Sequence, residues 1–293
     1  MELGAARIGI VGLGLMGASL AKKLTASRTV RRVGGWDRDG AVRRLARAQG
    51  MAEVPEGLEE LGSESDVLIF AVPWRSLADA DRAVRRGLAK GGQRMWAVMD
   101  LCSAKRAPGE LLRRSWGGRY VGFHPMAGKE RGGIIHATPE LFSGAPCAIV
   151  SYPDTAPEVR SFATRLATAL GMGPVEASPE GHDAAVAVVS HLPQLLASAL
   201  ALVAGEEVHR NPLGARLAGG GFRDTTRVAS CPAEGGADLV SANGDHLRRG
   251  IGRLIQILEE FLSLPEEALE ERLRAAASAR EEILAIAAGR SAA

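Results

Sequence analysis

The sequence predicts an α/β fold in which an N-terminal domain built on a parallel sheet is followed by an all-helical domain. Short apolar runs alternate with helix-length patterns through the first half of the chain. A glycine-rich turn follows the first of these runs, and helical patterns dominate the second half. The 293 residues are enough for about two domains, each with a hydrophobic core of its own.

Apolar runs in the first half are the predicted strands. They span residues 7–11, 32–36, 67–72, 95–99, 120–123 and 147–151. The run 67–72 contains no polar residue, which is typical of a parallel strand covered on both faces. Helices are predicted between the strands, at 16–27, 40–48, 77–90 and 106–114. This alternation is typical of βαβ units, whose strands are parallel.

The character of the chain changes after about residue 151. One more helix (157–170) and one possible strand (172–177) come first, and helices are then predicted at 179–210, 238–264 and 265–288, with a glycine-rich break at 219–221. Pro179 and Pro265 stand in the first turn of their helices, where proline is tolerated. We therefore expect a first domain at 1–160 and a helical second domain at 161–293.

Composition and charge exclude several classes of protein. The formal net charge is only +2, whereas a dedicated nucleic-acid-binding protein is strongly basic. No run reaches the roughly 18 uncharged apolar residues of a membrane span, and the first residues do not resemble a secretion signal. The three cysteines are too few and too scattered for a disulfide framework or a zinc site. We expect a cytoplasmic protein with no metal, no membrane partner and no nucleic-acid partner.

Three glycines follow the first predicted strand in the pattern Gly-x-Gly-x-x-Gly and begin the first predicted helix. In a Rossmann-type domain Gly12 makes the tight turn, Gly14 lets the backbone approach a pyrophosphate, and Gly17 lets the helix pack on the strand. The amides of Leu15 and Met16 at the helix N-terminus then favour an anion. The sequence therefore predicts a dinucleotide-binding site here.

Residues after the second and third strands extend this predicted site. Asp37 ends the second strand, where a carboxylate hydrogen-bonds ribose hydroxyls and repels a 2′-phosphate, so the expected cofactor is NAD. The neighbouring Arg38 leaves NADP possible, because a guanidinium there binds that phosphate. A simple Asp-Arg-Asp-Gly turn is the alternative explanation of Asp37. Val72 and Pro73 complete the predicted cofactor site, together with Ser103.

Three further segments carry polar groups: 100–105, 124–133 and 219–227. The first two follow parallel strands, and open α/β sheets bind ligands at the carboxyl ends of such strands. Together with the glycine motif and Ser-His-Leu-Pro at 190–193, they resemble the prephenate/arogenate dehydrogenase family of tyrosine biosynthesis. The specific parts are His-Pro-Met-Ala-Gly at 124–128 and Gly-Phe-Arg-Asp-Thr-Thr-Arg at 221–227. The resemblance runs in order from about residue 7 to residue 245.

The resemblance implies an NAD-dependent oxidoreductase whose helical domain forms a homodimer. Prephenate would lose a hydride from the ring carbon that bears the hydroxyl, and carbon dioxide from the opposite carbon, to give 4-hydroxyphenylpyruvate. Because aromatisation drives the decarboxylation, the site has to supply only a base for the hydroxyl proton and cations for the carboxylates. Arogenate, the amino-acid counterpart of prephenate, would give tyrosine by the same reaction.

By this resemblance His124 is the catalytic base, and Ser103 hydrogen-bonds the substrate hydroxyl beside the nicotinamide. Arg227 binds a substrate carboxylate through a two-pronged contact. The other predicted substrate-binding residues are Gln194, Ser190, Gly220, Glu130 and Lys129. The residues alone leave other roles open: a structural histidine at 124, a helix cap at Ser103, and an ion pair of Arg227 with Asp224 or Asp183.

Two positions depart from the family pattern. Gln194 stands where many members that use prephenate carry a histidine, and the segment 231–236 stands where many carry a tryptophan. Since Gln194 can hydrogen-bond a keto acid or an amino acid, prephenate and arogenate both stay open. β-Hydroxyacid dehydrogenases share the opening motif, but residues 165–200 contain no lysine to serve as their catalytic residue. A dinucleotide-binding protein without enzymatic activity is the remaining alternative.

Overall fold

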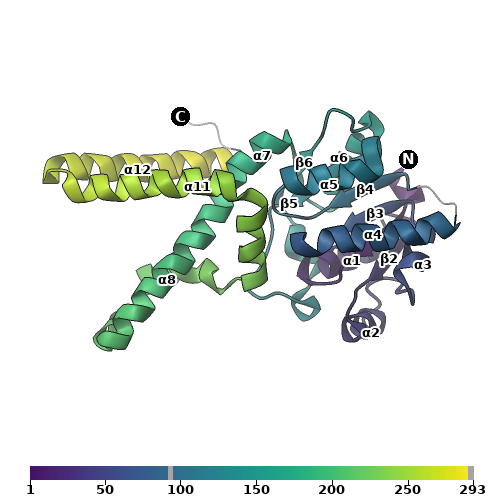
Figure 1. Cartoon of the computed structure of the whole chain (residues 1–293), viewed down its shortest axis with the longest axis horizontal. Helices are drawn as coiled ribbons and strands as arrows, with labels where there is room; N and C mark the ends of the chain where they lie inside the picture. The colour runs from purple at the N-terminus through teal and green to yellow at the C-terminus, as the bar shows by residue number, and fades with distance from the viewer. Residues whose placement is uncertain (92–94, 290–293) are drawn as a thin grey trace. The chain divides into compact units, whose positions relative to one another are not determined.

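The computed structural model describes residues 1–91 and 95–289 (Figure 1). Residues 290–293, the end of the predicted second domain, lie outside this range. The chain divides into two compact units, Met1–Leu247 and Arg248–Ala293. The first unit holds the sheet, the helices around it and every candidate site residue.

A seven-stranded sheet forms the centre of the first unit, in the order β2-β1-β3-β4-β5-β6-β7. The strands are β1 (Arg7–Val11), β2 (Arg32–Trp36), β3 (Val67–Phe70), β4 (Ala97–Asp100), β5 (Tyr120–Pro125), β6 (Pro146–Val150) and β7 (Gly173–Ala177). Neighbouring strands are parallel except for β5 and β6. Because β1 lies between β2 and β3, the chain reverses its winding direction there, as in a doubly wound α/β fold. The predicted α/β class is confirmed.

The pairing of β5 with β6 corrects the prediction of a wholly parallel sheet. In this antiparallel pair Gly122 faces Val150 and Pro125 faces Cys147. The chain passes from β5 to β6 through a loop with short 3-10 turns at Ile134–His136 and Pro139–Phe142, without a crossover α-helix. A strand that starts at the edge where the previous strand ended runs antiparallel to it. The loop therefore stays at the carboxyl ends of the parallel strands, where ligands bind.

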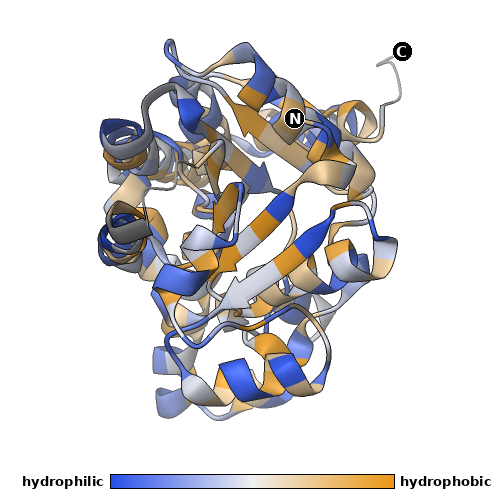
Figure 2. Ribbon diagram, turned by 90° about the vertical axis from the view of Figure 1, so that its right-hand side faces the viewer, coloured by the Kyte–Doolittle hydropathy of each residue, from blue (hydrophilic) through white to orange (hydrophobic). Residues whose placement is uncertain are grey.

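Helices cover both faces of the sheet. α1 (Leu15–Ser27) and α6 (Pro157–Ala169) pack on one face, whereas α3 (Leu58–Ser63), α4 (Trp74–Gly91) and α5 (Arg106–Trp116) pack on the other. Successive strand residues alternate between the two cores, so Ile69 packs with α1 while Phe70 packs with α4. Apolar residues are concentrated along the strands (Figure 2). Burial of each large apolar side chain contributes about 1.5–3 kcal/mol to the stability of these two cores.

Most predicted elements begin and end within a few residues of the observed ones, including α2 (Gly40–Ala48). The predicted strand 67–72 ends at Phe70, because the chain turns away through Pro73 and enters α4 at Trp74. The short helix α3 was not predicted. The possible strand predicted at 172–177 is β7, and it pairs with β6 in the sheet. The sheet therefore continues past residue 160, the predicted end of the first domain, which lies within α6. The domain limits 1–160 and 161–293 stay predictions.

Helices follow the sheet in the first unit. α7 (Pro179–Val186), a π-helical turn (Ala187–His191) and α8 (Leu192–Arg210) form one continuous helix, as predicted for 179–210. α9 (Leu213–Leu217) ends before the predicted glycine break at 219–221, whereas α10 (Gly220–Thr226) begins within it. α11 (Ala233–Ser263) begins in this unit and is interrupted at Asn243, whose φ of −136° is not helical.

The helix Pro179–Arg210 is long and apolar enough to cross a membrane by length and composition, with a mean hydropathy of 1.8 over its most apolar window. This finding qualifies the expectation that no such segment exists. Only 22% of that window is buried, and Leu202 and Val203 are exposed residues of the helix. Length and composition are weak grounds for a membrane span, since helices that pack within or between soluble chains share them. This one helix therefore does not indicate a membrane protein.

The second unit consists of the end of α11 and of α12 (Glu266–Ala287). Pro265 lies in the turn between the two helices, where its fixed φ suits the start of α12. Arg272 Nε lies 3.0 Å from Glu260 Oε1 and joins α12 to α11 near this turn. The two helices lie close to the predicted ranges 238–264 and 265–288.

Candidate active site

A cavity of about 430 Å³ lies at the carboxyl ends of the central strands. Its lining combines the glycine-rich loop, the ends of β3, β4 and β5, the loop after β5, and residues of α8 and α11. Several predicted site residues meet in it: Gly14, Leu15, Met16, Val72, Pro73, Ser103, His124, Lys129 and Gln194. Segments that are far apart in the sequence therefore form one pocket.

The glycine-rich loop has the geometry that the sequence predicts for an anion site. Gly12 has a φ of +96°, which favours glycine. A Cβ on Gly17 would lie 1.9 Å from the carbonyl oxygen of Gly12, so only glycine lets α1 pack this closely on the turn. A Cβ on Gly14 would meet nothing within 4 Å, and Gly14 is the N-cap of α1. Open space in front of a helix N-terminus fits a dinucleotide pyrophosphate.

A second cavity of about 510 Å³ adjoins the first, because Gly14, Val72 and Pro73 line both. Gly12, Asp37 and Arg38 line this second cavity as well. The Asp37 carboxylate accepts hydrogen bonds from the backbone amides of Leu13 (2.8 Å) and Asp39 (2.9 Å). The bond from Asp39 belongs to the local Asp-Arg-Asp-Gly turn, which was the alternative explanation of Asp37. The bond to Leu13 fixes the carboxylate against the glycine loop, and each oxygen retains a lone pair for a ribose hydroxyl.

His124 lies near the end of β5 and is 8% exposed. Its Nδ1 lies 2.9 Å from Nε2 of His182, and Nδ1 of His182 lies 2.8 Å from Oδ1 of Asp183. Burial lowers the pKa of His124 well below 6.5, and the positive charge of Lys105 lowers it further. The imidazole is therefore neutral at pH 7 and has a lone pair for a proton.

A buried ion pair lies beneath the cavity. Lys105 Nζ donates to Asp100 Oδ1 at 2.7 Å, and both side chains are fully buried. The Tyr120 hydroxyl donates to the other oxygen of Asp100 at 2.6 Å, and Tyr152 donates to the Lys105 carbonyl at 2.6 Å. Because both charges are compensated by close partners, the pair is tolerated in the core. It fixes the backbone of the segment that carries Ser103.

Lys129, Gln194 and Ser103 also line the first cavity, as does Asp238 of α11. Lys129 Nζ donates to the carbonyl of His136 at 3.0 Å within the loop after β5. Gln194 lies opposite Gly236, since a Cβ on Gly236 would lie 3.4 Å from Gln194 Nε2. The two positions at which the sequence departs from the family pattern are therefore neighbours in space.

The structure does not bring Arg227, Glu130, Ser190 and Gly220 into the cavity with His124. Arg227 and Glu130 form an ion pair that lines a separate cavity of about 570 Å³. The Arg227 side chain is 62% exposed. Lys129 lines the first cavity while Glu130 lines the other, so the two cavities are neighbours along this loop. Ser190 lies in the π-helical turn and Gly220 at the start of α10.

Cys102 and Cys231 also line the first cavity. Burial raises the pKa of both thiols, so neither is a thiolate nucleophile at pH 7. Among residues 1–91 and 95–289, no group of three or more His, Cys, Asp and Glu side chains could hold a metal ion. The polar groups that line the pocket are thus a neutral histidine, a serine hydroxyl, a lysine, a glutamine amide, two thiols and the carboxylate of Asp238.

Two family models match the chain. "Prephenate dehydrogenase, nucleotide-binding domain" matches residues 20–170, and "Prephenate dehydrogenase, dimerization domain" matches residues 178–276. The chain belongs to the prephenate dehydrogenase family. The predicted family is therefore confirmed, and with it the assignment to the oxidoreductases.

Relatives and solved structures agree with this assignment. The prephenate dehydrogenase of Lactococcus lactis subsp. cremoris is 29% identical over 226 residues, which are 76% of this chain and 61% of that protein. The chain thus spans about three fifths of that relative's length. The prephenate dehydrogenase from A. aeolicus, in complex with hydroxyphenyl propionate and NAD+, has a TM-score of 0.86 at 26% identity and covers 97% of this chain and 100% of its own. Synechocystis arogenate dehydrogenase has a TM-score of 0.77 at 27% identity and covers 94% and 99%.

The sequence did not predict two sets of contacts that residues of the helical segment make with the nucleotide-binding part of the chain. His182 and Asp183 reach His124 from α7, although the sequence indicated only a helix start there and Asp183 as an alternative partner of Arg227, which pairs with Glu130 instead. Asp238 of α11 accepts hydrogen bonds from the Trp74 amide and from Arg75, both at 2.8 Å, and thereby caps α4 beside the cavity. A buried carboxylate at a helix N-terminus leaves no sequence signal when it comes from a distant helix.

Proposed function

We propose that this protein is a prephenate dehydrogenase that uses NAD and forms 4-hydroxyphenylpyruvate, carbon dioxide and NADH. The observation that carries the proposal is the common cavity of the glycine-rich loop, Ser103 and a neutral, buried His124. A hydride acceptor, a hydrogen-bonding hydroxyl and a base are the groups that oxidation of a secondary alcohol requires. The named relatives and the A. aeolicus complex support the same substrate and cofactor.

NAD+ bound in the two adjoining cavities supplies the hydride acceptor. Gly14, Leu15 and Met16 at the start of α1 would hold its pyrophosphate through backbone amides. Asp37 would bind the adenosine ribose, and Val72 and Pro73 would line the path between the two cavities. Arg38 beside Asp37 keeps NADP as a possible second cofactor.

His124 accepts the substrate's hydroxyl proton at Nε2 while a hydride leaves the carbon that bears that hydroxyl. Ser103 hydrogen-bonds the same oxygen and orients it toward His124. The bond between the opposite ring carbon and its carboxylate then breaks, and its electron pair enters the ring to make it aromatic. The phenolate oxygen takes the proton back from His124, so the base is regenerated and carbon dioxide is released.

Cations in and beside the cavity would bind the two carboxylates of the substrate. Lys129 lines the cavity itself, and Gln194 would hydrogen-bond the substrate side chain. Arg227 is paired with Glu130 in the neighbouring cavity. A substrate carboxylate that displaced Glu130 would take over this guanidinium by the same charge-assisted contact. Ser190 and Gly220 stay predicted substrate-binding residues.

Arogenate is the second candidate substrate. Gln194 lines the cavity and lies next to Gly236, and neither residue carries a charge that would select a keto acid over an amino acid. The likeness to the Synechocystis arogenate dehydrogenase supports the same alternative. The amide of Gln194 both donates and accepts hydrogen bonds, so it suits either side chain.

The proposed assembly is a homodimer in the cytoplasm, formed through the helical segment. The matching dimerization-domain model supports this part of the proposal. Exposed apolar residues such as Leu202 and Val203 on α8 would lie in such an interface.

Steady-state kinetics with prephenate and arogenate, each with NAD and with NADP, test the proposal. We expect the highest kcat/KM with prephenate and NAD. A higher kcat/KM with arogenate would select the second candidate. Absence of reduced cofactor with both substrates, from a folded protein that binds NAD, would refute the proposed function.

A further inference from the structure

A chain of three buried side chains leads from the helical segment to the proposed base. His124 Nδ1 and His182 Nε2 are 2.9 Å apart, and His182 Nδ1 is 2.8 Å from Asp183 Oδ1. The exposed fractions are 8% for His124, 4% for His182 and 0% for Asp183. Water therefore does not compete for these contacts, and the hydrogen-bonding pattern of one residue constrains the next.

We propose that His182 and Asp183 are positioning residues that hold His124 in the tautomer with its proton on Nδ1, so that Nε2 presents a lone pair to the cavity. This inference rests on the proposed role of His124 as the base. It adds two residues of α7 to the reaction, neither of which lines the cavity.

The direction of the chain follows from its carboxylate end. A carboxylate only accepts hydrogen bonds, so Nδ1 of His182 carries a proton. Nε2 of a neutral His182 then has only a lone pair and must accept from His124. Nδ1 of His124 therefore carries the proton, and Nε2 is left as the basic nitrogen.

Asp183 is held as a carboxylate by its own contacts. Its two oxygens accept the backbone amides of Lys105 (2.7 Å) and Arg106 (2.9 Å), at the start of α5. Burial alone would raise the pKa of Asp183, but the hydrogen bonds from His182 and these two amides lower it below its usual value. Asn243, at the interruption of α11, donates to the Asp183 carbonyl at 2.8 Å and fixes the backbone there.

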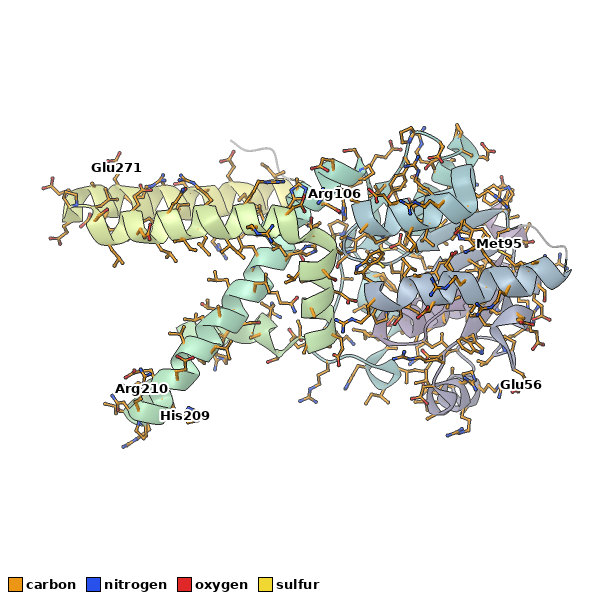
Figure 3. All side chains as sticks on the ribbon, in the orientation of Figure 1. Glu56, Met95, Arg106, His209, Arg210 and Glu271 are labelled. Atoms are coloured by element: carbon orange, nitrogen blue, oxygen red, sulfur yellow. The ribbon has the colours of Figure 1, made fainter. Side chains whose placement is uncertain are left out.

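The same carboxylate also anchors the segment that carries Ser103. Arg106, labelled in Figure 3, reaches from α5 to Asp183 of α7 and Asp245 of α11. Asp183 thus fixes the hydrogen-bonding state of His124 and the backbone just after Ser103 at once. The two groups that would meet the substrate hydroxyl are oriented by one residue that would not touch it.

The test compares His182→Leu with His182→Gln. Leucine fills space but has no acceptor, whereas the glutamine carbonyl oxygen can accept from Nδ1 of His124. Long-range ¹⁵N–¹H spectra of histidine-labelled protein report which ring nitrogen carries the proton. His209, exposed at the end of α8 (Figure 3), gives the control variant His209→Leu.

In the wild type and in His182→Gln we expect His124 to carry its proton on Nδ1. In His182→Leu the Nε2–H tautomer should appear, and kcat should fall about 10²–10⁴-fold, by analogy with loss of the correct tautomer in a hydrolase triad. The dissociation constants for NAD and for hydroxyphenyl propionate should change less than about twofold, and His182→Gln should regain at least about tenfold in kcat.

An Nε2–H tautomer of His124 in the wild type would overturn the inference. Equal losses of kcat in both His182 variants, with the tautomer unchanged, would also overturn it and leave His182 a structural residue. If the tautomer shifts as expected but the wild type oxidises neither prephenate nor arogenate, the positioning chain stands and the proposed function fails.

Discussion

His124 must be unprotonated to accept a proton, and its surroundings favour that state. Burial lowers its pKa below 6.5, and the positive charge of Lys105 lowers it further. The folded protein therefore binds a proton at His124 less readily than the unfolded chain does, and its stability declines as the pH falls below about 6.5. Above that pH the neutral base is present in full.

The lowered pKa of His124 predicts how kcat/KM depends on pH below neutrality. We expect kcat/KM to stay level as the pH falls from 7.5 to 6.5 and to decline only at lower pH, where free His124 becomes protonated. Steady-state kinetics over this range, with the fold followed by circular dichroism, provide the measurement. A kcat/KM that falls to half its maximum above pH 6.5 would show that the pKa of His124 is raised, which would contradict this prediction.

Asp37 gives the second residue-scale prediction. Asp37→Ser should lower kcat/KM with NAD and raise it with NADP, since the change removes repulsion of the 2′-phosphate and lets Arg38 bind it. The amide of Leu13 can still find an acceptor in serine, so the loop should keep its shape. Arg38→Ala in the same background is the control and should cancel the gain with NADP. A wild type that already prefers NADP would contradict the assignment.

At the scale of elements, the sequence predicted the strands and helices whose apolar patterns are local. The roles of Gly12 and Gly17 depend only on the local turn between β1 and α1, so the spacing of the motif was enough to predict them. The antiparallel β6 could not be predicted, because its direction depends on a loop that lacks periodicity. His182, Asp183 and Asp238 were missed for a related reason: their partners are far away in sequence and carry no pattern.

Asp238 offers a test of how α11 supports α4. Asp238→Ala removes a buried acceptor for the Trp74 amide and the ion pair with Arg75, so the free energy of unfolding should fall by about 1–3 kcal/mol. Arg75→Ala removes only the ion pair of a side chain that is 52% exposed, and should cost less than about 1 kcal/mol. Urea denaturation of both variants measures the difference. Equal losses would mean that the cap at Trp74 contributes nothing.

At the scale of the whole molecule, exposed apolar residues on α8 predict self-association. Leu202 is 70% exposed and Val203 is 64% exposed. A glutamate at Leu202 would place a charge in the proposed dimer interface, where its desolvation is unfavourable. We expect sedimentation velocity to show a dimer for the wild type and a monomer for Leu202→Glu. Val175→Glu, at a position 54% exposed on β7, is the control and should remain dimeric.

A dimer of unchanged stability in Leu202→Glu would contradict this prediction and show that the interface does not include this part of α8. The sequence could predict that the second half is helical, because 179–210 and 265–288 are rich in alanine, leucine and glutamate, which favour helices. It could not predict which face of α8 a second chain covers, since nearly every face of this helix is apolar.

The most direct test of the account follows NADH and carbon dioxide together in the wild type and in His124→Asn, with prephenate and NAD. Asparagine keeps a hydrogen-bonding side chain at the end of β5 but cannot accept the hydroxyl proton. We expect the wild type to release NADH and carbon dioxide in equal amounts, and the variant to lose about 10²–10⁴-fold in kcat while binding NAD normally. Near-normal turnover by folded His124→Asn would contradict the central claim that His124 is the base.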